Sequence, residues 1–355
     1  MRYSSNFYEV LYTYNQALGT KRGWLDYHMN PVAPTRFGIQ VVLALAEIEK
    51  KQAGLGAAFA KELAAVPYVP ADVSERQWLD NFEALIQKLA ELIVLKAICS
   101  VEWRAPFEIL IEPTNATTGK KPDFVVNEDG HKWLFEVKCP AFIKYSALRR
   151  KNLLQLPVRS FLHNLVQDDP GGLTLPRDNV VKDFLSSAEE KFSKFSEDQT
   201  SVLTIVWDSH IYEAISILKH TEAGLLTPKS WHKNKAQIVS FSSVDHVLVL
   251  NKMNSLVAGA REERILFGDE PFLLDRENGL PTVWCANDEE NTVDKRILRA
   301  FDAWPYDGTL IAADYALLDV VYWLNPFEII QRRRRMARRL PYLISTSPLP
   351  YNLYL

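Results

Sequence analysis

One continuous stretch, from Lys121 to Pro140, restricts the possible fold more than any other part of the chain. Two short runs rich in β-branched and aromatic residues, Phe124–Val126 and Lys132–Val137, lie on either side of a polar segment that ends in Gly130. A segment of this kind lets a strand turn back along its neighbour. The sequence therefore predicts a β-hairpin here.

The hairpin places three charged side chains near one another. Side chains alternate across a strand, so Glu136 and Lys138 project from one face and Phe135 projects from the other. Pairing across the turn brings Asp123 close to Glu136. Two neighbouring carboxylates repel each other unless a cation lies between them, and oxygen ligands are those that Mg²⁺ or Mn²⁺ prefers. A metal there, with Lys138 to position water or neutralise developing charge, implies phosphodiester hydrolysis.

These residues resemble the motif of the PD-(D/E)xK nuclease superfamily, the restriction-endonuclease-like group. Pro122-Asp123 corresponds to the PD element and Glu136-Val137-Lys138 to the ExK element. The resemblance covers at most Ser74–Leu250. It implies a mixed α/β fold with an αβββαβ core around a central mixed sheet, dependence on Mg²⁺ or Mn²⁺, and a nucleic-acid substrate, DNA rather than RNA. A surface hairpin with an incidental Glu-Lys pair is the alternative.

A helix from Ser74 to about Ile98 is predicted in front of the hairpin, because Ser74 is a good N-cap and apolar residues recur at helical spacing. Members of the superfamily often carry a further acidic residue on this helix, and the candidates here are Glu83 and Glu91. We favour Glu91 as a catalytic residue, since its neighbours are apolar and a buried carboxylate needs a partner. The alternative is that Glu91 lies on a solvated face.

Basic residues near the hairpin are candidates for phosphate contacts, because phosphates supply most of the affinity for nucleic acid. These candidates are Lys120, Lys121, Arg149 and Arg150. A second candidate is the block Arg332–Arg339, which holds six arginines. For both groups, the alternative is a set of solvated side chains or a helix terminus whose dipole favours cations.

The remaining pattern divides the chain into a helical N-terminal region (1–73), the nuclease core (74–250) and an α+β extension with the arginine block in its last helix (251–355). Helices are expected at Thr35–Lys51, Leu55–Ala65, Tyr145–Val166, Asn179–Phe195, Ile211–Lys219, Val293–Ala303 and Ala312–Arg339. Strands are expected at Val101–Glu112, Ser201–Trp207, Val247–Leu250, Arg264–Phe267 and Thr282–Cys285.

Composition narrows the functional class. The 355 residues are 47% hydrophobic and 24% charged, as in globular proteins generally, and the formal net charge is −3. Three scattered cysteines indicate neither a disulfide framework nor a zinc cage, and no apolar run has transmembrane length, so we expect a cytoplasmic protein that does not bind membranes. No phosphate-binding loop or Gly-x-Ser-x-Gly motif is present. A motor or specificity subunit would be a separate chain, and self-association remains open. An inactive nuclease-fold module that binds nucleic acid or a protein is the alternative function.

Overall fold

A computed structural model describes residues 3–308, apart from gaps at 71, 114–120, 152–153, 156–172, 175, 196–197, 209–210, 262–270, 275–281, 289–291 and 293. Beyond residue 308 it describes only Val321–Tyr322, and at 148–151, 154–155, 173–174 and 321–322 it describes the backbone alone. Among the described helices, none is both long and apolar enough to cross a membrane.

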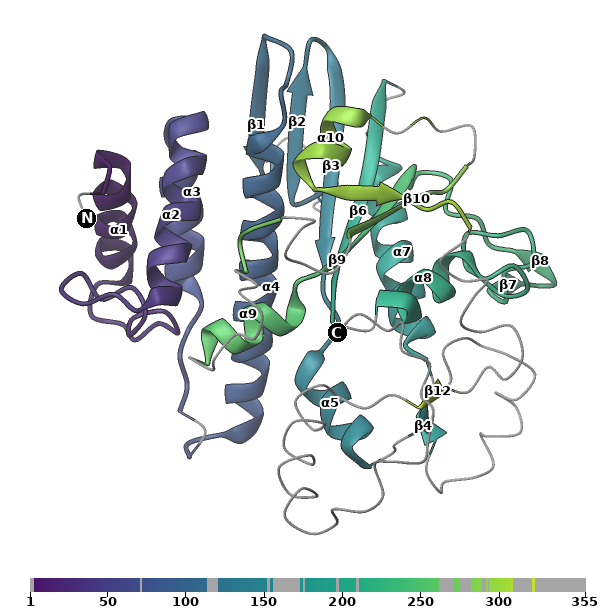
Figure 1. The fold of residues 1–355 in the computed structure, drawn as a ribbon, viewed down its shortest axis with the longest axis horizontal. Helices are drawn as coiled ribbons and strands as arrows, with labels where there is room; N and C mark the ends of the chain where they lie inside the picture. Colours follow the sequence, from purple (N-terminus) through teal and green to yellow (C-terminus); the bar gives the residue numbers. More distant parts are fainter. Residues whose placement is uncertain are drawn as a thin grey trace, which may run out of the picture.

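The fold is mixed α/β, as predicted, and is built on a central mixed sheet of seven strands in the order β1-β2-β3-β6-β9-β10-β11 (Figure 1). β1, β2 and β3 are antiparallel neighbours, β3, β6 and β9 run parallel, and β10 is antiparallel to β9 and parallel to β11. The strands are β1 (Phe107–Ile111), β2 (Phe124–Glu128), β3 (His131–Lys138), β6 (Gln199–Trp207), β9 (His246–Asn251), β10 (Thr282–Ala286) and β11 (Ala303–Pro305). Short strands β4 (Leu154–Gln155), β5 (Leu173–Thr174) and β12 (Val321–Tyr322) form a second sheet, and β7 (Lys233–Asn234) pairs with β8 (Gln237–Ile238).

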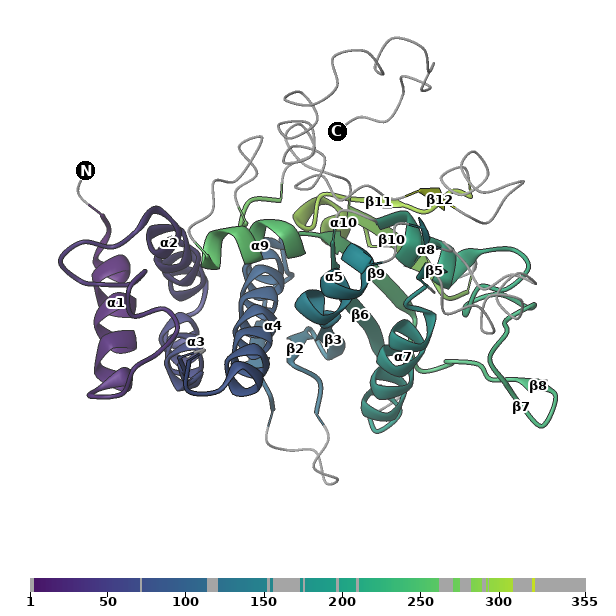
Figure 2. The same cartoon turned by 90° about the horizontal axis from the view of Figure 1, so that it is seen from below.

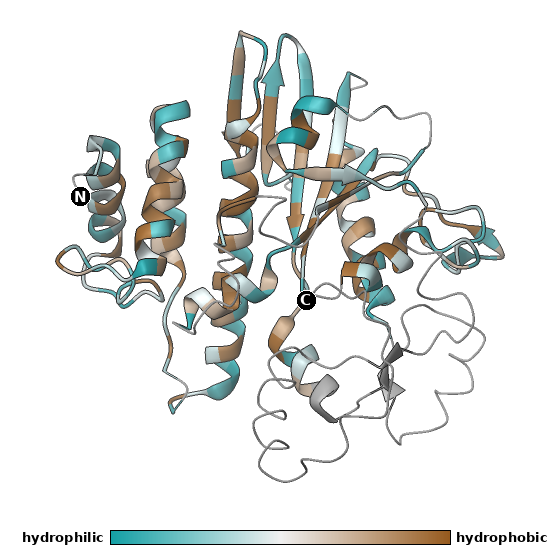
Figure 3. Cartoon of the chain, in the orientation of Figure 1, coloured by the Kyte–Doolittle hydropathy of each residue, from teal (hydrophilic) through white to brown (hydrophobic). Residues whose placement is uncertain are grey.

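Helices cover both faces of the central sheet (Figure 2). Alternate residues of β3 and β6 belong to two separate apolar clusters: Phe135 and Val137 pack with α4, α9 and α10, whereas Leu134 and Ile205 pack with α7 and α8. The helices are α4 (Glu75–Ser100), α5 (Phe142–Lys151), α7 (Asp178–Phe192), α8 (Ile211–Lys219), α9 (Met253–Ala260) and α10 (Lys295–Ala300). Apolar residues predominate in the inner strands and on the helix faces that meet them (Figure 3).

Three N-terminal helices, α1 (Ser5–Leu18), α2 (Arg36–Lys51) and α3 (Leu55–Ala65), pack beside α4 and share its apolar cluster. The predicted cap of α4 is present, since Ser74 Oγ accepts from the Gln77 N–H (3.2 Å). α2 has a similar cap, in which Thr35 Oγ1 accepts from the Gly38 N–H (3.1 Å). Gln52, which follows α2, bonds the outer edge of the sheet through both the N–H and the carbonyl of Ile109 (2.9 and 2.8 Å). The amide thus covers part of a strand edge that would otherwise be open for pairing.

The predicted hairpin is confirmed. β2 and β3 pair with Phe124 opposite Phe135 and Glu128 opposite His131, and Asp129-Gly130 forms the turn. Both turn residues have positive φ, 47° and 87°, as a two-residue hairpin turn of this type requires.

Some predicted boundaries are wrong. The first strand begins at Phe107 rather than Val101, because Trp103 Nε1 donates to the Ile98 carbonyl (2.9 Å) and holds the preceding segment against the end of α4. The helix predicted over Tyr145–Val166 runs from Phe142 to Lys151 and is followed by β4, and the predicted range contains Pro157, which disfavours a helix interior.

The C-terminal predictions also need correction. α10 is shorter than predicted and is followed by β11, where Trp304 precedes Pro305 and is therefore biased to extended backbone. Val321–Tyr322, inside the helix predicted over Ala312–Arg339, pairs with β4 as strand β12. The rest of that predicted helix and the predicted strand Arg264–Phe267 lie outside the described residues.

Protonation of His246 should make stability depend on pH. Trp284 Nε1 donates to His246 Nδ1 (3.1 Å), and burial lowers the pKa of the imidazole to about 4. The unfolded chain takes up this proton near 6.5, so the stabilisation is complete above that pH and is lost as pH falls towards 4. Unfolding by urea at pH 7 and pH 5 should show a loss of about 1–2 kcal/mol from this group, based on about 1.4 kcal/mol per pKa unit.

His246→Gln, whose amide oxygen can still accept from the indole, should show a smaller loss between the two pH values. His220→Gln is the control, since His220 follows α8 at a partly exposed position, and should keep the wild-type dependence. An equal loss in wild type and His246→Gln would contradict the assignment.

Candidate functional site

The predicted convergence of Asp123, Glu136 and Lys138 is confirmed by the geometry. Asp123 immediately precedes β2, and because Phe124 pairs with Phe135, its side chain reaches the end of β3. Asp123 Oδ2 accepts a hydrogen bond from the Val137 N–H (2.7 Å). Lys138 Nζ lies 2.6 Å from Glu136 Oε1. The strand pairing therefore fixes two carboxylates and one ammonium at the end of the hairpin.

A second lysine, which the sequence interpretation missed, completes this group. Lys191 near the end of α7 places its Nζ 2.6 and 2.7 Å from the two carboxylate oxygens of Glu136 and 3.9 Å from Asp123 Oδ1. The Glu136 side chain is 0% exposed. A fully buried carboxylate is tolerated only with partners of this kind. The only sequence signal is that Lys191 precedes Phe192 at the border of the apolar stripe of α7.

Burial and charge shift the acidity of these groups. Burial, together with the neighbouring Glu136 and Glu91 carboxylates, raises the pKa of Asp123 to about 8. For Lys138, burial would lower the pKa of the ammonium, but contact with Glu136 outweighs it and raises that pKa. Ionisation of Asp123 is therefore unfavourable in the protein alone. An added cation would stabilise the ionised carboxylate.

Glu91 is buried and near this group, so the solvated-face alternative is wrong. Its side chain accepts from Gln87 Nε2 (3.0 Å) and pairs with Lys88 Nζ (2.7 Å). Lys88 also contacts Glu62 Oε2 (3.0 Å) on α3. Burial raises the pKa of Glu91, and its charge acts on both Asp123 and Lys138.

Gln87, which sequence reasoning also missed, fixes the backbone on both sides of Lys138. Its Nε2 donates to the Val137 carbonyl (3.0 Å), and its Oε1 accepts from the N–H (3.2 Å) and Sγ (3.1 Å) of Cys139. One amide thus holds the end of β3 as a neighbouring strand would. Its position four residues before Glu91, on the same helix face, was the available signal.

The other predicted residues are placed less directly. Glu83, the second acidic candidate, lies against the start of α5, where the Lys144 ammonium and the N–H groups of Ile143 and Lys144 partly offset the rise that burial causes in its pKa. Lys121 is half-buried at the loop before Asp123. Arg149 and Arg150 lie in the last four residues of α5, for which only the backbone is described, and Lys120 and the block Arg332–Arg339 lie outside the described residues.

The donor set fits a hard divalent cation bound by few protein ligands. Asp123 and Glu136 both approach the same Lys191 nitrogen, so they are closer than the roughly 8 Å beyond which one ion could not bridge them. Within the described residues, no three His, Cys, Asp or Glu side chains form a cluster that could hold a metal. Mg²⁺ commonly uses one or two carboxylates and completes its shell with water and phosphate. Two carboxylates therefore suffice to bind Mg²⁺ together with water and phosphate. They are too few to surround a metal ion with protein ligands alone.

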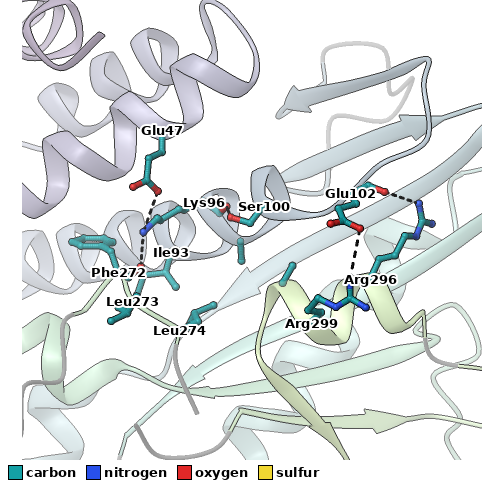
Figure 4. A pocket seen from close by; sticks show the side chains of 12 residues that line it. Glu47, Ile93, Lys96, Ser100, Glu102, Phe272, Leu273, Leu274, Arg296 and Arg299 are labelled. Carbon is teal, nitrogen blue, oxygen red and sulfur yellow. Dashed lines mark hydrogen bonds and ion pairs between the residues drawn. The ribbon is translucent and has the colours of Figure 1, made fainter. Parts of the chain in front are cut away.

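A cavity of about 330 Å³ lies elsewhere, between α2, α4, α10 and the segment Phe272–Leu274 (Figure 4). Four of its charged side chains pair with one another: Lys96 Nζ contacts Glu47 (3.2 Å) and also donates to the Phe272 carbonyl (3.0 Å), and Arg299 contacts Glu102 (3.7 Å). These contacts connect the N-terminal helices to the C-terminal part of the described chain. A smaller cavity of about 150 Å³ adjoins Gln87 and Cys139.

Comparisons with protein-family models, with curated proteins and with solved structures gave no match.

Proposed function

We propose that the chain is a metal-dependent nuclease with a restriction-endonuclease-like core, which hydrolyses phosphodiester bonds of nucleic acid, DNA in particular. The observation that carries the proposal is the meeting of Asp123, Glu136 and Lys138 at one end of a hairpin, with the spacing of a PD…ExK motif. The order of elements supports it: α4, then the antiparallel strands β1, β2 and β3, then α5 and α7, then β6 parallel to β3.

Asp123 and Glu136 would hold the metal, Mg²⁺ or Mn²⁺. When bound there, the ion would supply a Lewis acid for the scissile phosphodiester and for an attacking water. Glu91 is within electrostatic reach and would add negative charge that favours a cation without itself being a required ligand.

Lys138 would act on the substrate side of the reaction. Its ammonium is held by Glu136 and remains 23% exposed, so it can reach a phosphate oxygen or a water. A cation fixed beside the reacting group stabilises the charge that develops in the transition state. Gln87 would position Lys138 by holding the backbone of Val137 and Cys139.

Cleavage in the presence and absence of metal tests the proposal. The purified chain should nick or degrade plasmid or linear DNA with Mg²⁺ or Mn²⁺, and EDTA should stop the reaction completely. An RNA strand of the same sequence measures the preference for DNA. Cleavage that is unchanged in EDTA would exclude the mechanism, and metal-dependent cleavage of RNA alone would correct the substrate.

One observation favours a second candidate, an inactive module of the same fold that binds nucleic acid or a protein. Both oxygens of Glu136 are paired with lysine, an arrangement that is electrostatically complete without a metal. The module would bind DNA with an affinity that EDTA does not alter, and it would leave the DNA intact at every metal concentration.

A further inference from the structure

Lys191 contacts charged residues of the hairpin although it belongs to a distant helix. It comes from α7, more than one element away from the hairpin, and its side chain is 16% exposed. Its ammonium contacts both oxygens of Glu136 and approaches Asp123. It therefore occupies the space between the two carboxylates that the proposed function assigns to the metal.

Lys138 differs from Lys191 in this respect. Lys138 Nζ lies 2.6 Å from Oε1 of Glu136 and comes from the same strand as that carboxylate, and no ion pair within the described residues joins it to Asp123. It therefore does not link the two carboxylates as Lys191 does. Lys191 differs because its ammonium already contacts the carboxylate oxygens that would hold the metal.

We propose that Lys191 is a tethered counter-ion of the metal site: its ammonium pairs with Glu136 beside Asp123 in the metal-free protein, and a divalent cation must displace it to bind. This inference rests on the proposed function, since it concerns the same two carboxylates. The Lys191 ammonium and a divalent cation held by the same carboxylates would repel each other strongly in a partly buried site. The metal affinity of the free protein is consequently weaker than its two carboxylates alone would give.

Calorimetric titration of Mn²⁺ into the nucleic-acid-free protein tests this inference without any measurement of cleavage. Lys191→Met removes the ammonium and keeps an unbranched side chain, so Mn²⁺ should bind at least about tenfold more tightly than to wild type, which corresponds to about 1.4 kcal/mol. Lys191→Gln should change the affinity in the same direction, and it serves if the methionine variant does not unfold cooperatively.

Two controls separate charge at this position from charge in general. Lys191→Arg keeps a cation near Glu136 and should bind Mn²⁺ no more tightly than wild type. Lys182→Met removes a lysine of the same helix whose Nζ contacts Asp183 (2.9 Å), and it should leave the affinity unchanged.

The outcomes distinguish the two proposals. If wild type binds Mn²⁺ and Lys191→Met binds it equally or more weakly, Lys191 supports the site instead of competing with the metal, and this inference is overturned while the nuclease proposal stands. If none of the proteins binds Mn²⁺ and Asp123→Asn cleaves DNA at the wild-type rate, the metal site itself is refuted, and both proposals fail.

Discussion

Asp123→Asn is expected to lower metal-dependent cleavage by at least about 100-fold, the scale seen when a group that stabilises transition-state charge is removed. The amide oxygen can still accept from the Val137 N–H, so the hairpin geometry should persist. Burial and neighbouring carboxylates raise the pKa of Asp123 to about 8, which means that the ionised carboxylate does not stabilise the fold at neutral pH. The variant should therefore unfold at the same temperature as wild type or a higher one.

Asp129→Asn provides the matched control, because Asp129 lies in the turn of the same hairpin, is exposed, and has a positive φ that asparagine tolerates. Initial rates of DNA cleavage and thermal unfolding should be measured for both variants. Retention of wild-type rates by Asp123→Asn would remove the proposed role, whatever the stability.

Lys138→Met should lower the rate by a similar factor and leave the binding of Mn²⁺ largely intact, since Lys138 is not proposed as a ligand. Lys132→Met is its control, because Lys132 lies on the same face of β3 at the other end of the strand. A variant that loses both activity and cooperative unfolding would point to a structural role of the Lys138–Glu136 pair.

The sequence was sufficient for features that depend on local interactions. Ser74 and the apolar spacing after it located α4, and the polar turn before His131 located β2 and β3, because capping and hairpin turns involve residues close in the chain. The position of Asp123 opposite Glu136 followed from the same hairpin. The central mixed sheet was also predicted correctly as a class.

Sequence reasoning missed the residues whose roles depend on packing between distant elements. Lys191 reaches Glu136 only because β6 pairs with β3 and carries α7 over that face of the sheet. Gln87 reaches the end of β3 only because α4 packs on the opposite face. Neither pairing can be read from periodicity, which reports the burial of a helix face and not its partner.

Glu213→Ala is expected to have the largest effect on folding, a loss of about 3–5 kcal/mol, because it removes one partner of a buried ion pair. Glu213 on α8 is 0% exposed, and it accepts from the N–H (3.0 Å) and Nε (3.1 Å) of Arg177 and from the Tyr145 hydroxyl (3.2 Å). The Arg177 guanidinium lies between the rings of Tyr145 and Trp207, 4.1 and 3.9 Å from their centroids.

This cluster connects α5, the start of α7, the end of β6 and α8. These elements lie near the carboxyl-terminal ends of β3 and β6. Glu222→Ala is the control: Glu222 also pairs with a cation, Lys229 at 2.7 Å, but both side chains are at least 60% exposed, and such pairs contribute about 0–1 kcal/mol. Urea unfolding should show a large loss for Glu213→Ala and almost none for Glu222→Ala. Equal, small losses would mean that Arg177 finds adequate partners without Glu213, and that the aromatic rings and Asp208, 3.0 Å from its Nη1, hold this corner of the fold.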